Sequence, residues 1–248
     1  MNGQIHPSVV LATALRILQQ LRRDRRTVAM VLLVPPVLLT LLKYVFDGQP
    51  QLFQRVGPPL VGLFPLILMF IITSIAMLRE RTNGTLERLM SMPLAKLDLL
   101  LGYGLAFAVV ATIQATVASV VAFGLLGLDT AGPVWLVVAL AVANAVLGMS
   151  LGLFISAFAT SEFQAVQFMP ATLMPQFFLV GLFAPRDRMA APLEAASSVL
   201  PLTYAYDALA RAAANDIDGR FWIDLAVGAG CVLLALALGA TTLRRRTD

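Results

Sequence analysis

The stretch Leu60–Leu78, LVGLFPLILMFIITSIAML, contains 19 residues and no charged side chain. A helix needs about 20 mainly apolar residues to cross the hydrocarbon core of a bilayer, so this stretch predicts a membrane-spanning helix. Similar runs recur along the chain, which is 59% hydrophobic and 13% charged, with a mean hydropathy of +0.84 over 248 residues. This composition has too few polar groups to cover a soluble core, and it predicts an all-α membrane protein.

Six membrane spans are predicted from these runs. Pro35 and Pro36 lie in the first and Pro170 and Pro175 in the fifth, and because proline removes a backbone donor we expect kinks or breaks there. The fifth run is the shortest, which leaves open whether it crosses the bilayer alone. Barrel strands would be far shorter and would alternate in polarity. The predicted spans are near residues 28–45, 60–78, 99–126, 134–159, 168–183 and 222–243.

An amphipathic helix is predicted before the first span, within residues 1–26. From Ser8 to Arg23 polar residues recur at helical spacing, and apolar residues cover the rest of the surface. We expect this helix to lie in the membrane interface with its basic edge toward lipid headgroups or a cytoplasmic partner; the alternative is a surface helix with no further role. The polar edge consists of Thr13, Arg16, Gln20 and Arg23.

Residues 27–248 are predicted to form a single six-helix transmembrane domain. A charged loop at 79–94 follows the second span, and an external segment at 184–220 precedes the last. Prolines interrupt this external segment, but it is rich in Ala and Leu. It therefore predicts short re-entrant or interfacial helices.

The distribution of Lys and Arg predicts the orientation. Twelve of the 18 basic residues lie in the N-terminal arm, in the loop after the second span or in the C-terminal tail. Basic residues concentrate on the cytoplasmic side of membrane proteins, so both termini and the charged loop are expected to be cytoplasmic. The isoelectric point near 9.7 then reflects topology and contact with anionic lipid, and nucleic-acid binding is not indicated.

Several kinds of chemistry are excluded by the residues present. His6 is the single histidine, so neither a histidine-based metal site nor a Ser-His-Asp triad is expected within the spans. No G-x-x-x-x-G-K-[ST] motif occurs, so the chain is not expected to bind ATP phosphates itself. The centres of the predicted spans lack ionisable residues, which argues against an ion-coupled carrier.

Neutral polar residues do occur within the predicted spans. Hydrogen bonding between helices is one interpretation, supported by Gly148 and Gly152 at the small-x-x-x-small spacing of close helix contacts. The other is that some of these residues line a substrate path, and so weakly polar a path would suit an apolar or amphipathic cargo. The candidates for that path are Gln114, Asn144 and Gln176.

The charged loop has internal structure of its own. Asn83-Gly84 predicts a turn, and Thr85 can cap a short helix that Pro93 limits. Leu86, Leu89 and Met90 fall on one side of that helix. This pattern predicts an amphipathic helix that protrudes into the cytoplasm, although a solvated loop would carry the same charge.

The loop also resembles a known family. The pattern Arg79-Glu80-Arg81-x-x-Gly84-Thr85-Leu86-Glu87-x-Leu89-x-x-x-Pro93 is similar to the loop after the second span in permeases of the ABC transporter type-2 export family, and in particular those of the daunorubicin-resistance type. A second block, in residues 183–211, is similar to that family's external segment before the last helix: Pro201-Leu202-Thr203-Tyr204, then Asp207, Ala208 and Arg211. The resemblance covers essentially the whole chain.

This resemblance implies the permease subunit of an ATP-driven exporter in a bacterial cell membrane. Such a permease pairs with a second one, identical or homologous, and binds separate ATP-binding subunits that carry ATP and Mg²⁺, while it binds no cofactor itself. The N-terminal arm resembles the family's connecting helix and residues 79–94 its coupling loop, with a smaller second contact at Thr160–Gln164. The residues implied at the ATPase are Arg79, Glu80, Arg81, Gly84, Thr85, Leu86, Glu87, Arg88, Leu89 and Glu162.

The implied cargo is an apolar or amphipathic drug or a lipid-like molecule. The external loops are short and lack the hydrolytic or sugar-binding insert of larger family members, so the resemblance gives less support to a lipid-linked polysaccharide. Two other functions stay open from the sequence. One is an ion-independent carrier outside the ABC class, and the other is a membrane assembly subunit that transports nothing.

Overall fold

The computed structural model describes residues 6–84 and 96–242, with side chains from residue 98 onward in the second range. Most of this part of the chain is helical and no strand occurs in it, which confirms the predicted all-α class. The α-helices are α1 (Pro7–Arg23), α2 (Arg25–Val45), α3 (Pro50–Thr82), α5 (Lys96–Ser119), α6 (Val134–Ile155), α7 (Glu162–Leu179), α8 (Ala191–Ser197), α9 (Pro201–Ala214) and α10 (Gly219–Thr242).

Five of the predicted spans coincide with helical segments long and apolar enough to cross a membrane in the described residues: α2, α3, α5, α6 and α10. A π-helical turn, Val120–Leu125, extends α5, and a 3₁₀ turn, Ser156–Phe158, extends α6. The predicted fifth span corresponds to α7, which has 18 residues but begins with the polar residues Glu162 and Gln164 and falls short of the same standard. That α7 crosses the bilayer stays a prediction.

Proline does not interrupt these helices. α2 continues through Pro35 and Pro36, and α7 continues through Pro170 and Pro175, so the expectation of a break is wrong. Each proline removes one backbone donor. Within a membrane protein, neighbouring helices and side chains can bond to the backbone groups that this leaves free, so the helix can continue. α3 likewise begins at Pro50, ten residues before the predicted span. Its 33 residues extend about 50 Å, well beyond a hydrocarbon core of about 30 Å.

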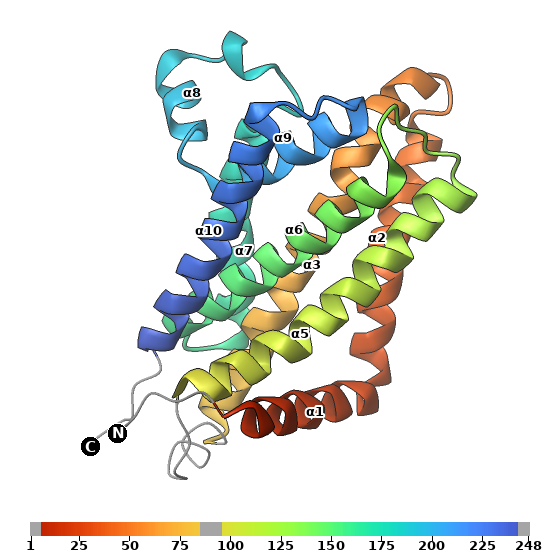
Figure 1. The fold of residues 1–248 in the computed structure, drawn as a ribbon. Helices are drawn as coiled ribbons and strands as arrows, with labels where there is room; N and C mark the ends of the chain where they lie inside the picture. Colours follow the sequence, from red (N-terminus) through yellow and green to blue (C-terminus); the bar gives the residue numbers. More distant parts are fainter. Residues whose placement is uncertain (1–5, 85–95, 243–248) are drawn as a thin grey trace.

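α3 and α6 form the centre of the bundle (Figure 1). Gly148 and Gly152 of α6 face the α3 backbone so closely that a Cβ atom on either would collide with a carbonyl oxygen, that of Leu66 or of Phe70. Thr73 of α3 donates a hydrogen bond to the backbone oxygen of Met149, at 3.2 Å. The predicted role of these glycines in close helix packing is confirmed.

The two ends of the bundle carry helices that run across it (Figure 1). α1 crosses one end, where α3 and α10 finish and α5 and α7 begin, and we name this the α1 end. α8 and α9 lie at the opposite end, which we name the α9 end. α9 packs on α3, α6 and α10 through an apolar face that includes Leu202, Ala205 and Leu209.

The structure changes the expected orientation of α1. Its helix matches the prediction, but Thr13 is buried, and a Cβ atom at Gly102 of α5 would come within 2.5 Å of the Thr13 Cβ. Arg16 also faces the protein, while Leu11 and Leu15 are 55% and 50% exposed. The predicted polar edge therefore lies partly against α5, where Thr13 packs on Gly102 and Arg16 bonds to Tyr103. Only its Gln20 and Arg23 remain exposed.

Candidate functional site at the end of α3

The last turn of α3 carries Arg79, Glu80 and Arg81 in succession. Successive side chains of an α-helix point about 100° apart, so three neighbours reach in three directions. Here they contact α7, α1 and α10, respectively. The end of α3 is therefore joined to three other helices at the start of the predicted coupling loop, 79–94, whose residues 79–82 are helical and not part of a loop.

Arg79 binds Glu162, the first residue of α7, through both ends of its guanidinium. Its Nε lies 2.6 Å from Oε1 and its Nη2 lies 2.9 Å from Oε2. This two-point geometry is the strongest arrangement for an arginine and a carboxylate. The hydrogen bonds from Arg79 lower the pKa of the Glu162 carboxyl, so the pair stays ionised at neutral pH.

Glu80 points toward α1 and lies 3.6 Å from the Arg16 guanidinium, with 13% of its side chain exposed. Arg16 also donates a hydrogen bond of 2.7 Å to the hydroxyl of buried Tyr103 on α5, and its guanidinium carbon lies 5.9 Å from the centre of that ring. Glu80, Arg16 and Tyr103 thus join α3, α1 and α5 in one polar contact. Neither Arg16 nor Tyr103 was predicted as a site residue. Arg16 has the sequence surroundings of an ordinary interfacial residue, and Tyr103 lies in an apolar run.

Arg81 and Gly84 complete the described part of this site. Arg81 is half-buried, and its Nη2 donates to the Thr242 hydroxyl at the end of α10, at 3.4 Å. Gly84 adopts a left-handed backbone with φ of 67°, which favours glycine, and the predicted Asn83-Gly84 turn is confirmed. The remaining predicted coupling residues, Thr85, Leu86, Glu87, Arg88 and Leu89, lie outside the described residues.

The three polar residues proposed for a substrate path occupy different surroundings. Asn144 donates to the backbone oxygen of Ala205 on α9 at 3.1 Å, and Gln176 accepts from the backbone N–H of Leu202 at 3.3 Å. Gln114 is fully buried, and neither end of its amide has a partner among the described residues. Two of the three thus attach α9 to α6 and α7. The structure does not bring the three together, and a path role for any of them stays a prediction.

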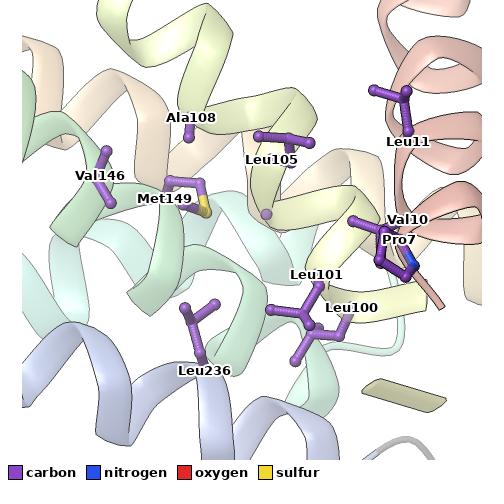
Figure 2. Close-up of a pocket in the computed structure, with 11 residues that line it drawn as sticks. Pro7, Val10, Leu11, Leu100, Leu101, Leu105, Ala108, Val146, Met149 and Leu236 are labelled. Atoms are coloured by element: carbon purple, nitrogen blue, oxygen red, sulfur yellow. The ribbon is translucent and has the colours of Figure 1, made fainter. Parts of the chain in front are cut away.

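Two apolar cavities lie beside these helices. The larger, of about 660 Å³, lies between α1, α5, α6 and α10 at the α1 end, and its lining residues are all apolar; Figure 2 shows Leu11, Leu105, Met149 and Leu236 around it. The smaller, of about 360 Å³, lies between α6, α9 and α10 and includes Asn144. Their linings suit hydrocarbon more than a polar solute.

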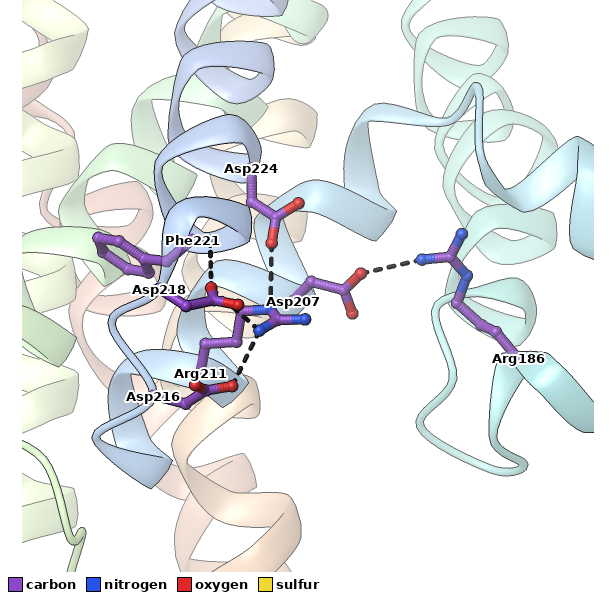
Figure 3. A network of polar contacts seen from close by, with 7 residues as sticks. All are labelled: Arg186, Asp207, Arg211, Asp216, Asp218, Phe221 and Asp224. Atoms are coloured by element: carbon purple, nitrogen blue, oxygen red, sulfur yellow. Dashed lines mark hydrogen bonds and ion pairs between the residues drawn. The ribbon is translucent and has the colours of Figure 1, made fainter.

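The α9 end holds a second polar network, which sequence reasoning did not identify (Figure 3). Arg186 binds Asp207 at 2.9 Å, and Arg211 of α9 lies among Asp216, Asp218 and Asp224, at 2.8, 3.3 and 3.5 Å. Asp218 also accepts from the backbone N–H of Phe221 at the start of α10. The network ties the segment after α7 to α9, and α9 to α10. Asp207 and Arg211 belong to the block that resembles the family's external segment, but nothing local indicated their partners.

The electrostatics of this network are set by burial. Burial raises the pKa of the Asp207 carboxyl, and the guanidinium groups of Arg186 and Arg211 partly oppose that rise. Across the described residues, no group of three or more His, Cys, Asp or Glu side chains is arranged to hold a metal ion. The polar contacts at both ends join one helix or segment to another.

Comparison with known proteins identifies the class to which this membrane fold belongs. The family model described as ABC-2 type transporter matches residues 9–212, a range that runs from α1 through α9 and includes the end of α3. The chain therefore belongs to the ABC-2 type transporter family.

Individual relatives are more distant. The chain is 28% identical over 152 residues to the probable multidrug ABC transporter permease YbhR of Escherichia coli K12, a match that covers 61% of this chain and 41% of that protein. It is 27% identical over 164 residues to ABC transporter G family member 20 of Dictyostelium discoideum, which covers 65% of this chain and 22% of that protein. The matched region thus spans less than half the length of each relative.

Proposed function

We propose that this chain is the transmembrane permease subunit of an ATP-driven exporter, and that separate ATP-binding subunits carry ATP and Mg²⁺. The observation that carries the proposal is the family match over residues 9–212, which takes in the connected end of α3 as well as the spans. The turn at Asn83-Gly84 and the loop after it are where such a partner would act, since they follow the end of α3, which is linked to α1, α7 and α10. The chain would transmit motion and would not hydrolyse ATP itself.

The proposed cargo is an apolar or amphipathic molecule, drug-like or lipid-like. Its support is the mainly apolar lining of both cavities and the similarity to the probable multidrug ABC transporter permease of Escherichia coli. A second permease, identical or homologous, would complete the transport path. The proposed location is a bacterial cell membrane with the α1 end in the cytoplasm, which the concentration of Lys and Arg at that end supports.

ATP-dependent export tests this proposal. The chain is coexpressed with a candidate ATP-binding subunit, and uptake of a fluorescent amphipathic dye is measured in inside-out vesicles with and without ATP. We expect uptake only with ATP and with an intact ATPase, and a subunit lacking its phosphate-binding lysine is the control. Uptake without ATP would instead indicate a carrier outside the ABC class. Copurification of an ATPase with no dye uptake and no dye-stimulated hydrolysis would indicate an assembly subunit.

The predicted coupling residues are tested in the same assay. Leu86→Asp places a charge on the predicted apolar side of the loop helix, and Glu87→Ala removes a charge beside it. We expect both variants to weaken copurification of the ATPase and to lower export. Val199→Asp is the matched control, because Val199 is 77% exposed at the α9 end. Full export by both loop variants would contradict a coupling role for this loop.

A further inference from the structure

α7 is held to the rest of the chain by few buried side chains. Of its 18 residues only Ala165 and Leu173 are buried. Phe163 and Phe178 of the same helix are 72% and 61% exposed. An element with so little buried apolar area depends more than its neighbours on specific contacts at its ends.

Those contacts are polar and lie at opposite ends of α7. At the α1 end Glu162 binds Arg79 of α3, and at the α9 end Gln176 accepts from the backbone of Leu202 on α9. Between them α7 contacts mainly α3. The Arg79–Glu162 pair is therefore the polar connection between α7 and the helix that leads into residues 85–95.

The geometry of this pair favours a definite register. Arg79 lies in the last turn of α3 and Glu162 in the first turn of α7, so each charge is favourable to the dipole of its own helix. The start of α7 is fixed as well, because the Ser161 hydroxyl accepts from the Gln164 N–H at 3.2 Å and the Gln164 side chain accepts from the Thr160 N–H at 2.8 Å. The guanidinium therefore meets a carboxylate that the local backbone already positions.

A small apolar cluster lies beside the pair. Leu78 of α3, Ala159 of the preceding turn and Ala165 of α7 are buried together, with Ile75 and Phe168 packed against them. The cluster keeps the two helix ends in contact, but it leaves their relative rotation to the ion pair, because apolar contacts are not directional. The pair itself is about half exposed.

We propose that Arg79 and Glu162 are positioning residues that make α7 follow α3 when the loop after α3 is displaced. The inference rests on the proposed ATP-driven export, and it assigns a role to two residues that would act on each other without touching the ATPase. Displacement of the loop reaches α3 directly through the chain. The ion pair carries it to α7, so the two helices move as one body.

Charge exchange tests the pair. Arg79→Glu, Glu162→Arg and the double exchange are measured for ATP-dependent dye uptake and dye-stimulated hydrolysis together with the ATPase. We expect each single variant to lose about fivefold or more in uptake while the ATPase still copurifies, and the double exchange to recover most of that loss, as for directly interacting residues. Gln167→Arg is the matched control, since it adds the same charge at an exposed position of α7. It should behave as wild type.

Single variants that export at the wild-type rate would overturn the inference. A double exchange that exports no better than the poorer single variant would overturn it too. Loss of ATPase copurification in the single variants would also overturn it, because Arg79 and Glu162 would then bind the ATPase directly.

A distance measurement separates this inference from the proposed function. Spin labels at Asn83→Cys and Val166→Cys, in a Cys231→Ala background, report the separation of α3 and α7. We expect a narrow distribution in the parent, a broader one in each single charge variant and a narrow one again in the double exchange. Failure of wild-type export with these distances intact would refute only the proposed function. Unchanged distances in the single variants would refute the inference whether or not export occurs.

Discussion

Single side chains at the α9 end connect the short helix α9 to its neighbours, and Gln176 of α7 is the clearest case. Its side-chain oxygen accepts from the Leu202 N–H in the first turn of α9, while its nitrogen donates to Thr172 within α7. The first N–H groups of a helix have no partner inside it, so a side chain from another helix can cap them. Gln176 thus supplies a hydrogen-bond acceptor at the start of α9, where the side chain of the N-cap residue, Leu200, provides none.

Gln176→Leu is expected to destabilise the protein by about 1 kcal/mol, because the Leu202 N–H loses its acceptor. Thermal unfolding in detergent measures the effect. The control is Gln167→Leu, at an exposed position on the same helix. Equal unfolding temperatures for the two variants would mean that the contact contributes nothing.

The stability of the α9 end should depend on pH through Asp207. Burial raises the pKa of its carboxyl above the ordinary value of 3.8. At pH values between the ordinary pKa and the raised one, the folded protein therefore binds more protons than the unfolded chain. The contribution of Asp207 is therefore fully present below the ordinary pKa and is lost as pH rises through the raised one. Asp207→Asn should flatten this decline, and Arg186→Gln should steepen it, since Arg186 lowers that pKa.

Unfolding midpoints measured across that pH range check this sign. Asp187→Asn, at an exposed position nearby, serves as the control and should leave the profile unchanged. A steeper decline in Asp207→Asn would be the opposite of the expected result.

At the scale of elements, the crossing of α3 and α6 depends on the absence of side chains. Gly148 and Gly152 are four residues apart, so they lie on one face of α6, and the α3 backbone occupies the space where their Cβ atoms would be. Without a strong hydrophobic driving force in lipid, such close approach is the main source of helix association. The sequence spacing predicted a tight contact, and the structure identifies α3 as the partner.

Gly148→Ala is expected to cost about 1–3 kcal/mol, because the added methyl group would collide with the Leu66 carbonyl and separate the helices. Unfolding in detergent measures the loss. Gly230→Ala in α10 is the matched control, since no atom beyond its own stretch of helix lies within 4 Å of its Cβ position. That variant should be as stable as wild type or more stable, given the helix propensity of alanine.

Element boundaries could be predicted best where composition changes sharply. The start of α6 at Val134 and the extent of α1 match expectation within a residue. The first turns of α3 did not appear in the prediction, because residues 50–59 contain polar residues and three prolines that resemble a loop. In the folded chain Gln54 bonds to Gly127 and Asp129 in a distant turn, and such contacts have no local signal.

For the whole molecule, the two ends differ in both charge and construction. The α1 end gathers α1, the end of α3 and the starts of α5 and α7, and the α9 end holds short helices bound by arginine–aspartate pairs. If the molecule transmits motion between its ends, α3 is the longest continuous element available for it.

Cysteine labelling is expected to place the ends on opposite sides. In a Cys231→Ala background, Val199→Cys at the α9 end should react with a membrane-impermeant maleimide in intact cells. Asn83→Cys at the α1 end should react only after permeabilisation. Both positions are exposed in the structure, so a difference between them reports topology. Labelling in the reverse order would contradict the predicted cytoplasmic location of the α1 end.

The sequence by itself determined that this chain is an all-α membrane protein, where most of its spans lie and that a charged segment follows the second span. These properties depend on composition and on spacing along the chain, which local residues carry completely. Only the tertiary structure decided that Thr13 and Arg16 face inward and that Arg79 binds Glu162, 83 residues away. Such pairings depend on how helices pack across the bundle, and a local pattern cannot specify which distant side chain a residue will meet.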